Sequence, residues 1–356
     1  MKRKLKYKIN KWIKNHIDFK LQPEKAYSKP NLLWLENGKA CNLKCPMCAR
    51  EMDQSFHKGK DIHDKIFEMA KPYFDLCDGV QLFGWNEPLM DKKIFDKMKI
   101  IRDSGANIHF NTNLTYLTKE VAQKILDIPV YHIGLSIDAA TKEVYESIRI
   151  GADFDEIREN AKYLVNLKKE RGQELPHLQI VFTAIKSNLD ELPKMPAFAK
   201  DLGIDIVYVS EALFFTEEMV EKYSFKNSEL MERLEEGKEN ARELGVNLNY
   251  VHMDSLGYLE NIEGESENKN NKQKICTDLY TTMFILSNGD VLPCCLMSGH
   301  TLGNLNDQTI EEIWNGEGYR KLRRKIKEGE IPSICRTCPV LKDVHISKKQ
   351  YYGLSK

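Results

Sequence analysis

The chain has 356 residues, enough to bury a substantial core in one large domain with a smaller one beside it. Basic and acidic residues number 53 each, so the formal net charge is zero and nothing global predicts a nucleic-acid partner. No apolar run reaches the roughly 18 to 20 residues of a membrane-spanning helix, and no secretory signal is visible. We therefore expect a cytoplasmic protein in which seven of the nine cysteines, in two groups, serve as metal ligands rather than disulfides.

Residues 1–29 form a basic leader before the first predicted strand. Leu5, Ile9 and Trp12 recur at helical spacing among many lysines, which predicts a basic amphipathic helix. Two interpretations remain open for it. In the first, residues 1–21 contact a membrane surface, and the protein is a peripheral membrane protein. In the second, the helix packs on the main domain and its lysines lie in solvent.

Short apolar runs alternate with amphipathic helical patterns through residues 30–215. This alternation predicts an α/β fold with parallel strands and right-handed crossovers. Six units are too few for a complete eight-unit barrel, so we expect a partial (β/α)6 TIM-like barrel. The predicted strands are 32–35, 80–83, 108–111, 132–137, 178–185 and 204–209, and predicted helices are 62–74, 92–104, 119–127 and 154–169.

The remainder of the chain is predicted to contain a linker and a small cysteine-bearing domain. Residues 216–275 contain a charged helix followed by a polar stretch, which is typical of a linker. Residues 276–356 contain Asn288-Gly289 between two apolar runs, a signal for a hairpin with a type I′ turn. The predicted elements are helix 228–244, a hairpin over 283–293, and helices 309–314 and 318–327.

Three cysteines, Cys41, Cys45 and Cys48, follow the first predicted strand. Thiolates are suitable ligands for iron–sulfur clusters or zinc. Three cysteines on a 4Fe–4S cluster leave one iron open to an outside ligand, whereas structural zinc needs a fourth protein ligand, for which His57 is nearest in sequence. The C-x3-C-x2-C spacing resembles the radical S-adenosylmethionine (SAM) superfamily, and the resemblance extends over about residues 30–340. It implies a 4Fe–4S cluster that binds SAM and yields a 5′-deoxyadenosyl radical for hydrogen abstraction from a substrate C–H bond.

The segment after the second predicted strand resembles the family's Gly-Gly-Glu-Pro motif, which contacts the amino group of SAM. Gly84 permits a close backbone approach, and Asn86 stands at the second glycine position, where asparagine tolerates a left-handed backbone better than most residues. Glu87 would place the acceptor for the ammonium or supply it directly. The resemblance therefore implies cofactor binding by Gly84, Asn86 and Glu87, and the alternative is an ordinary strand-to-helix turn.

Four further residues correspond to SAM contacts in the family. Met47 stands where an aromatic residue near the adenine is usual. Asn113 is expected near the ribose, or merely at a helix-entry turn. Ser136 and Arg149 match a serine and an arginine that bind the ribose and the carboxylate, and a guanidinium is a good carboxylate partner. Asp138 lies in the same motif, and a simpler role for it is to cap the next helix.

A second group of cysteines comprises Cys276, Cys294, Cys335 and Cys338. By themselves they suit zinc or a 4Fe–4S cluster. C-terminal to a radical SAM domain, this spacing of cysteines resembles the SPASM/twitch extension. The resemblance implies one auxiliary 4Fe–4S cluster with four protein ligands. Such a cluster would transfer electrons rather than bind substrate. Cys295 is a spare ligand, a catalytic hydrogen-atom donor, or simply part of the domain.

The expected function is that of a radical SAM oxidoreductase or epimerase. Its substrate is expected to be a carbohydrate-like or lipid-linked small molecule, and its electron donor a flavodoxin or ferredoxin. One alternative is a SPASM maturase that modifies a ribosomally made peptide, which the short stretch before the first strand disfavours because many maturases carry a separate recognition domain. Another is a non-catalytic protein with two structural zinc sites.

Overall fold

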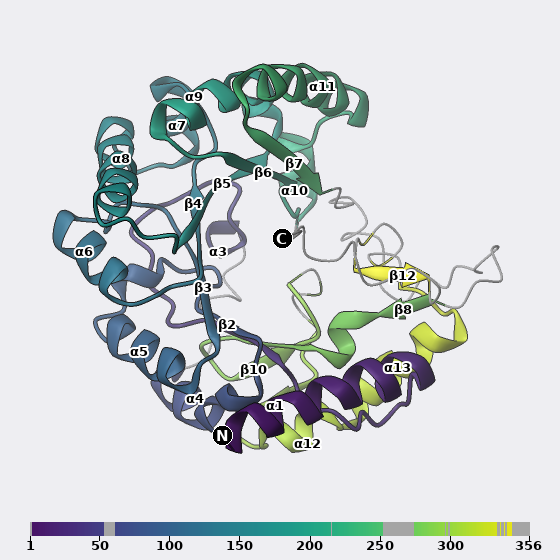
Figure 1. Cartoon of the computed structure of the whole chain (residues 1–356). Helices are drawn as coiled ribbons and strands as arrows, with labels where there is room; N and C mark the ends of the chain where they lie inside the picture. The colour runs from purple at the N-terminus through teal and green to yellow at the C-terminus, as the bar shows by residue number, and fades with distance from the viewer. Residues whose placement is uncertain are drawn as a thin grey trace.

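A computed structural model describes residues 2–52, 61–214, 216–251, 274–295, 297, 300–332, 335, 338 and 340–343 of the chain. Its main feature is a curved sheet with helices on the outer side (Figure 1). Seven strands pair in parallel, each with the next along the chain. They are β1 (Leu32–Leu35), β2 (Gly79–Gln81), β3 (Asn107–Thr112), β4 (His132–Ser136), β5 (His177–Ala184), β6 (Ile206–Glu211) and β7 (Asn247–Val251).

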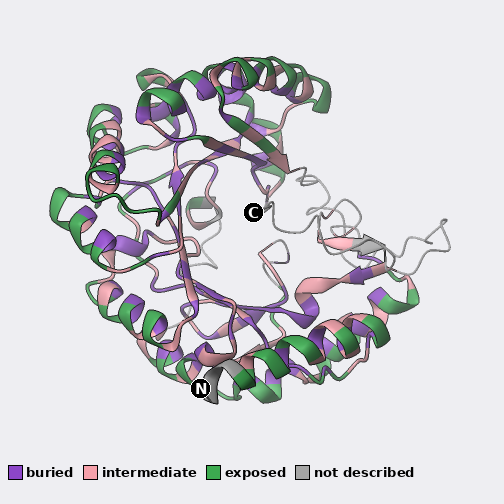
Figure 2. Cartoon of the chain, in the orientation of Figure 1, coloured by how far each residue is buried: buried purple, intermediate pink, exposed green. Residues whose placement is uncertain are grey.

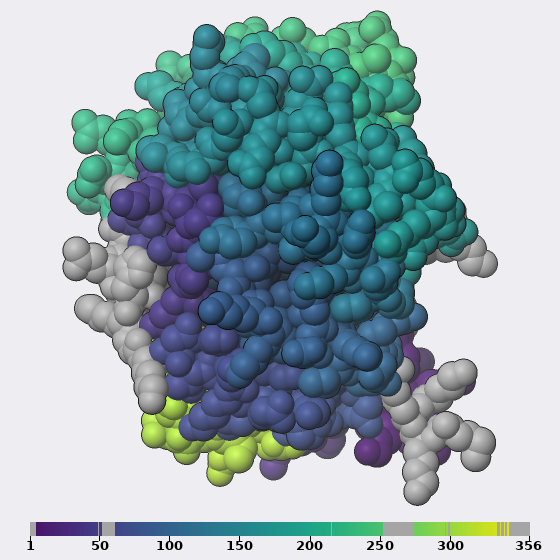
Figure 3. All heavy atoms as spheres, turned by 90° about the vertical axis from the view of Figure 1, so that its left-hand side faces the viewer, coloured from purple at the N-terminus to yellow at the C-terminus, as the bar shows by residue number. Residues whose placement is uncertain are grey.

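The helices between these strands turn their apolar sides toward the sheet, as the burial colours show (Figure 2). Side chains of successive segments of the chain cover this outer side as a continuous surface (Figure 3). This arrangement is a partial TIM-like barrel, as the alternating pattern predicts. The helices are α3 (Ala49–Met52), α4 (His63–Ala70), α5 (Ile94–Ser104), α6 (Lys119–Asp127), α7 (Lys142–Ile148), α8 (Phe154–Glu170), α9 (Met195–Leu202), α10 (Glu217–Tyr223) and α11 (Asn227–Leu244), with 3-10 turns η3 (Lys71–Leu76), η4 (Pro88–Met90) and η5 (Lys186–Lys194).

Strand β7 is a seventh parallel strand, one more than the sequence pattern indicates. It lies within the stretch 216–275, where the sequence analysis expects a helix and a linker, and pairs with β6 from Ile206↔Asn247 onward. As the last strand of the sheet it buries little, and Asn247 and Asn249 are exposed. An edge strand of this kind lacks the continuous apolar run that identifies strands buried on both faces.

The cysteine-bearing part of the chain extends the same sheet on the other side of β1. Strand β9 (Thr282–Ile285) pairs in parallel with β1, and β10 (Asp290–Leu292) and β11 (Gly303–Asn304) follow in antiparallel order. Gly289 has a φ of 95° in the predicted hairpin turn, a conformation that favours glycine. The other elements here are β8 (Lys274–Cys276), η6 (Thr277–Tyr280), α12 (Ile310–Trp314), α13 (Glu317–Glu328) and β12 (Leu341–Asp343), which pairs with β8.

The basic leader is helical, as its periodicity predicts. It consists of α1 (Lys2–Ile13), one π-helical turn η1 (Lys14–Asp18) and α2 (Phe19–Leu21), and α1 packs against η3. Trp314 and Arg323 of the cysteine-bearing part donate to the backbone oxygens of Ser28 and Glu24. Among the described residues no helix has the length and apolarity needed to cross a bilayer.

Candidate functional site

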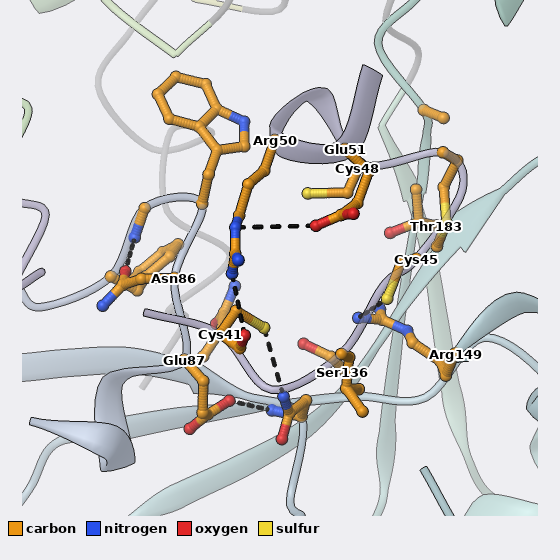
Figure 4. A pocket seen from close by; sticks show the side chains of 18 of the residues that line it. Cys41, Cys45, Cys48, Arg50, Glu51, Asn86, Glu87, Ser136, Arg149 and Thr183 are labelled. Carbon is orange, nitrogen blue, oxygen red and sulfur yellow. Dashed lines mark hydrogen bonds and ion pairs between the residues drawn. The ribbon is translucent and has the colours of Figure 1, made fainter. Parts of the chain in front are cut away.

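The three cysteines of the first motif line a pocket at the carboxyl ends of the parallel strands (Figure 4). The cavity measures about 320 Å³. Because parallel strands end at one edge of the sheet, residues that are distant in sequence meet there. The pocket brings together all the predicted SAM-binding residues: Met47, Gly84, Asn86, Glu87, Asn113, Ser136 and Arg149.

The cysteine thiols of this pocket are polarised by two neighbouring side chains. The Arg149 Nη1 lies 3.9 Å from the Cys45 Sγ, and the Asn113 Nδ2 lies 3.8 Å from the Cys41 Sγ. Burial raises the pKa of the Cys48 thiol to about 12, so its thiolate needs a positively charged partner. Three soft ligands that face one pocket fit a 4Fe–4S cluster with one iron open to SAM.

The zinc alternative for this motif depends on a fourth ligand. His57 lies outside the described residues. Within the part of the chain that the structure describes, no three His, Cys, Asp or Glu side chains are grouped as ligands of a single metal ion.

The carboxylate of Glu87 stabilises the loop after β2 through three hydrogen bonds. One oxygen accepts from the Leu89 backbone N at 3.1 Å and the Thr112 hydroxyl at 2.8 Å, and the other accepts from the Asn113 backbone N at 2.7 Å. Glu87 is 2% exposed, and burial raises its pKa to about 7 against the opposing effect of these hydrogen bonds. Its backbone N donates to the Ala40 oxygen, which ties the cysteine loop to this loop. Of the two roles considered for Glu87 toward the ammonium of SAM, these contacts favour the indirect one. In that role Glu87 positions neighbouring backbone groups and does not itself accept from the ammonium.

The loop around Gly84 is closed by asparagine side chains. The Asn86 Oδ1 accepts from the Gly84 N at 3.1 Å, and the Asn86 Nδ2 donates to the Asn37 Oδ1 at 3.2 Å. A Cβ on Gly84 would lie 2.7 Å from the Glu36 side chain, so this position requires glycine for close approach. Asn86 therefore maintains a loop whose backbone faces the pocket.

Arg149 is held in place by a buried carboxylate. The Asp138 Oδ2 accepts from the Arg149 Nε at 2.5 Å, and the Asp138 Oδ1 accepts from the Thr183 N at 2.8 Å. Asp138 is fully buried. Burial lowers the pKa of Arg149, but the charge of Asp138 together with Cys45, Tyr145 and the hydrogen bond to Asp138 raises it overall. The carboxylate thus orients the guanidinium toward the pocket, whereas the sequence offered it only as a cap for the next helix.

Two acidic residues of the site went unnoticed in the sequence. Glu36, directly after β1, accepts from the Trp85 N at 3.0 Å and the Ser287 N at 2.9 Å, which joins the barrel loop to the β9–β10 hairpin. Glu211, at the end of β6, lines the far wall of the pocket and accepts from the Tyr250 hydroxyl at 2.7 Å. A carboxylate at the carboxyl end of a buried strand was the available signal for both.

The second group of cysteines also comes together. Burial raises the pKa of the Cys294 thiol, and the neighbouring thiols of Cys295, Cys335, Cys276 and Cys338 raise it further. The four thiols of the sequence pattern are therefore neighbours, each of them partly exposed, and they suit a fully ligated iron–sulfur cluster. Cys295 is close enough to Tyr208 of β6 to raise the pKa of that phenol, after the larger effect of burial. It is not among the residues that line the first pocket.

Comparison with known proteins assigns both parts of the chain. The radical SAM superfamily matches residues 37–195, and the SPASM iron–sulfur cluster-binding domain matches residues 276–339. The tungsten-containing aldehyde ferredoxin oxidoreductase cofactor-modifying protein of Pyrococcus furiosus is 24% identical over 331 residues, which is 86% of each chain. The AdoMet-dependent heme synthase of Methanosarcina barkeri is 26% identical and covers 87% of this chain and 88% of its own. Mycofactocin maturase MftC of Mycolicibacterium smegmatis is 22% identical, with 89% and 77% covered.

Solved structures share the fold. Streptococcus suis SuiB superimposes with a TM-score of 0.62 at 21% identity, over 83% of this chain and 68% of that one. The enzyme anSMEcpe with bound AdoMet gives 0.58 at 20% identity, over 82% and 81%. The matched families imply a SAM-binding 4Fe–4S cluster and auxiliary iron–sulfur ligation, the cofactors for which the two groups of cysteines are suited. The chain therefore belongs to the radical SAM superfamily and carries a C-terminal SPASM domain.

Proposed function

We propose that this radical SAM/SPASM enzyme dehydrogenates a small, hydroxyl-bearing substrate of carbohydrate-like chemistry. The observation that carries the proposal is one pocket that combines the three cysteines, the Arg149–Asp138 pair and a polar far wall. When bound, the cluster and SAM supply a 5′-deoxyadenosyl radical, which removes a hydrogen atom from a C–H bond. The protein's part is to hold the cofactors, orient the substrate and exclude water.

The side of the pocket nearest the cysteines is suited to SAM. Arg149, fixed by Asp138, presents a guanidinium for the carboxylate of the methionine moiety. Met47 is buried and polarizable, which suits contact with a purine ring. Asn113 is held by Glu87 through its backbone and directs its side-chain amide at Cys41. These residues would keep the sulfonium beside the open iron without moving on reaction.

The polar residues of the pocket that match no SAM contact suit a substrate with hydroxyl groups. Thr183 brings a hydroxyl and Glu211 a carboxylate to the pocket lining, which also includes Ala212 and Leu213. Glu211 is 8% exposed and accepts a hydrogen bond from the Tyr250 hydroxyl at 2.7 Å. A buried carboxylate beside hydroxyl-bearing side chains suits a polar substrate better than an apolar one. The names of two relatives with long mutual coverage refer to a cofactor and to heme, which also favours a low-molecular-weight substrate.

Net dehydrogenation needs an acceptor for the electron left after hydrogen abstraction. Four cysteines at the second site leave no iron open to substrate, so an auxiliary cluster there is suited to electron transfer. Glu36 connects the two domains, since it accepts from the backbone N of Trp85 and of Ser287. The alternative outcome is epimerisation, in which Cys295 would return a hydrogen atom to the substrate.

Two measurements test this proposal. Anaerobically reconstituted and reduced protein should convert SAM to 5′-deoxyadenosine, and a substrate should accelerate this conversion. In a dehydrogenation one SAM is consumed for each oxidised product and no solvent deuterium enters the abstracted position. Deuterium incorporation that disappears in Cys295→Ala would instead establish epimerisation. Protein with full cluster content that forms no 5′-deoxyadenosine with any reductant would overturn the radical chemistry itself.

Peptide modification is the second candidate. The fold is shared with SuiB, which has been solved with its precursor peptide SuiA, and with anSMEcpe bound to peptides. MftC, a relative over most of the chain, is named a maturase. Short peptides encoded near the gene should therefore be compared with sugars and other small metabolites for acceleration of 5′-deoxyadenosine formation. Acceleration by a peptide alone would replace the small-molecule proposal.

The proposed reductant is a flavodoxin or ferredoxin. Such proteins donate single electrons, and the SAM-binding cluster must be reduced by one electron before each cleavage. Replacing a chemical reductant with reduced flavodoxin should sustain 5′-deoxyadenosine formation, and failure of both carriers to do so would exclude them. Contact of the leader with a membrane is a separate proposal and rests on different residues.

A further inference from the structure

The leader packs with its polar side inward. Asn10 is 6% exposed and exchanges two hydrogen bonds with the Lys29 backbone, at 3.1 and 2.8 Å. Asp18 is fully buried and accepts from the backbone N of Tyr27 and Ser28. Lys14 is 5% exposed and pairs with Asp78 at 3.7 Å. Asn10 and Asp18 thus bond to the chain that follows the helices, within residues 1–29, and Lys14 pairs with the barrel. The inward side of the leader is therefore polar, the reverse of an ordinary packed amphipathic helix.

The apolar side of α1 consequently faces solvent. Leu5 is 61% exposed, Ile9 50% and Trp12 55%. Their i, i+4, i+7 spacing places them on one face, which we call the leader stripe. Of the seven exposed large hydrophobic side chains among the described residues, five lie within residues 1–27. Three of these five lie on α1, and such clustering differs from the scattered exposed apolar residues of an ordinary surface.

Cations flank the leader stripe. Lys6, Lys8 and Lys11 lie beside it, and the sequence contains no acidic residue before Asp18. The Lys6 side chain is 66% exposed although its ammonium lies 3.5 Å from Asp75. A row of apolar side chains with a tryptophan, bordered by lysines, has the chemistry of helices that lie in the headgroup region of a bilayer.

The leader stripe lies at the opposite end of the barrel from the SAM pocket. The Tyr7 hydroxyl and the Lys11 ammonium bond to Asp78, which directly precedes β2, at the amino ends of the parallel strands. The cysteines lie at the carboxyl ends. In Figure 3 the dark purple leader is at the lower right, whereas the blue-purple cysteine loop is on the left.

We propose that the leader stripe docks this protein on the surface of a bilayer rich in anionic lipid. The apolar side chains enter the headgroup boundary, and the flanking lysines are attracted to anionic headgroups. A lysine near such a surface contributes about 1 kcal/mol, and Lys6 and Lys11 contribute less because they also pair with Asp75 and Asp78. The amino end of the barrel then faces the membrane and the SAM pocket faces away from it. Docking of this kind tethers the enzyme without requiring that the substrate be a lipid. It is independent of the proposed reaction, because the leader contributes no residue to the pocket.

The test is co-sedimentation of the reconstituted full-length protein with vesicles. Binding is expected to phosphatidylcholine vesicles that contain phosphatidylserine, to weaken as salt rises, and to be small with phosphatidylcholine alone. The triple variant Leu5→Ser, Ile9→Ser, Trp12→Ser should lose at least about tenfold in partitioning. Tyr116→Ser is the matched control, because Tyr116 is also exposed, at 40%, but lies outside the leader.

Three readouts separate this proposal from its rivals. Brominated lipid should quench fluorescence in the wild type more than in Trp12→Phe, and 5′-deoxyadenosine formation should be equal in the wild type and the triple variant. Absence of binding by the wild type, or equal binding by the triple variant, would overturn the proposal. So would a wild-type dimer that does not bind vesicles and that the triple variant converts to monomer, because a second copy of the chain would then cover the stripe.

Discussion

The two cysteine sites of this protein differ in how they are built. At the first, three cysteines in an eight-residue segment lie on a loop, and their neighbours come from the ends of several strands around an open pocket. At the second, Cys276 lies in β8 and Cys338 far along the chain, and burial raises the pKa of Cys276, Cys294 and Cys335. A three-cysteine site in a pocket lined by polar groups is suited to binding and reaction, and a site with four cysteine ligands is suited to electron transfer.

The buried arginines of the two domains differ in the same way. Arg149 pairs with a carboxylate and directs Nη1 at a cysteine of the pocket. Arg323 is 1% exposed, donates to the backbone oxygens of Leu279 and Glu24, and lies within 5.2 Å of three aromatic ring centroids. Burial lowers the pKa of Arg323 to about 10, whereas the Asp138 charge raises that of Arg149. The first arginine is poised for a ligand, and the second joins the leader to the SPASM domain.

The largest expected effect separates the two cysteine sites. Replacing Cys41, Cys45 and Cys48 by alanine should abolish 5′-deoxyadenosine formation and leave about half of the iron of a protein with two 4Fe–4S clusters. Replacing Cys335 and Cys338 should stop product formation but spare part of the SAM cleavage, provided that the domain still folds. Iron and sulfide assays with product analysis measure both. Unchanged iron in the triple variant would refute the first assignment.

The next largest effect is expected on SAM affinity, which should depend on Arg149 and not on Arg323. Arg149→Met should weaken SAM binding by about a hundredfold or more, because a charge-assisted partner of the carboxylate is lost. Arg323→Met should lower the melting temperature yet leave SAM affinity within a few-fold of the wild type. Asp138→Asn should resemble Arg149→Met in binding, since the guanidinium loses its fixed orientation. Calorimetric titration with SAM tests these variants, and equal affinities for Arg149→Met and the wild type would refute the assigned contact.

A smaller effect should appear in the pH dependence of stability. The pKa of Glu87 is about 7 in the folded state and near 4.5 when unfolded, so folding favours the protonated carboxyl. The stability that this group contributes is fully present below pH 4.5 and is lost as pH rises through 7. The loss amounts to about 3 kcal/mol. Urea unfolding of the metal-free protein at pH 5 and pH 8 should show it, and Glu87→Gln should lack that part of the pH dependence.

The smallest predicted effect concerns the connection between the domains. Glu36→Gln retains one acceptor oxygen but presents an amide to a backbone N–H, which should cost about 1–3 kcal/mol of unfolding free energy. The exposed Glu312→Gln, which removes a charged capping residue of α12, is the matched control and should cost less than about 1 kcal/mol. If the two variants unfold at the same urea concentration, Glu36 does not couple the domains.

Much of the site was determined by the sequence itself. The spacing of Cys41, Cys45 and Cys48 is local, so their common location needs no knowledge of the fold. The six anticipated strands occur within about two residues of their expected bounds, and α6 begins and ends where the pattern indicates. All the predicted SAM-binding residues line one pocket, because the carboxyl ends of parallel strands meet at one edge. Their individual roles toward SAM remain predictions.

Other features were decided only by tertiary structure. Glu36 reaches Ser287, 251 positions away, and no local pattern reports such a pairing. Strand β9 joins the barrel sheet beside β1 for the same reason, so the SPASM domain continues the sheet rather than standing apart. The leader is the clearest case. Its periodicity predicts a helix, but the face that packs is chosen by the partners available, and here the buried hydrogen bonds of Asn10 and Asp18 turn the apolar side outward.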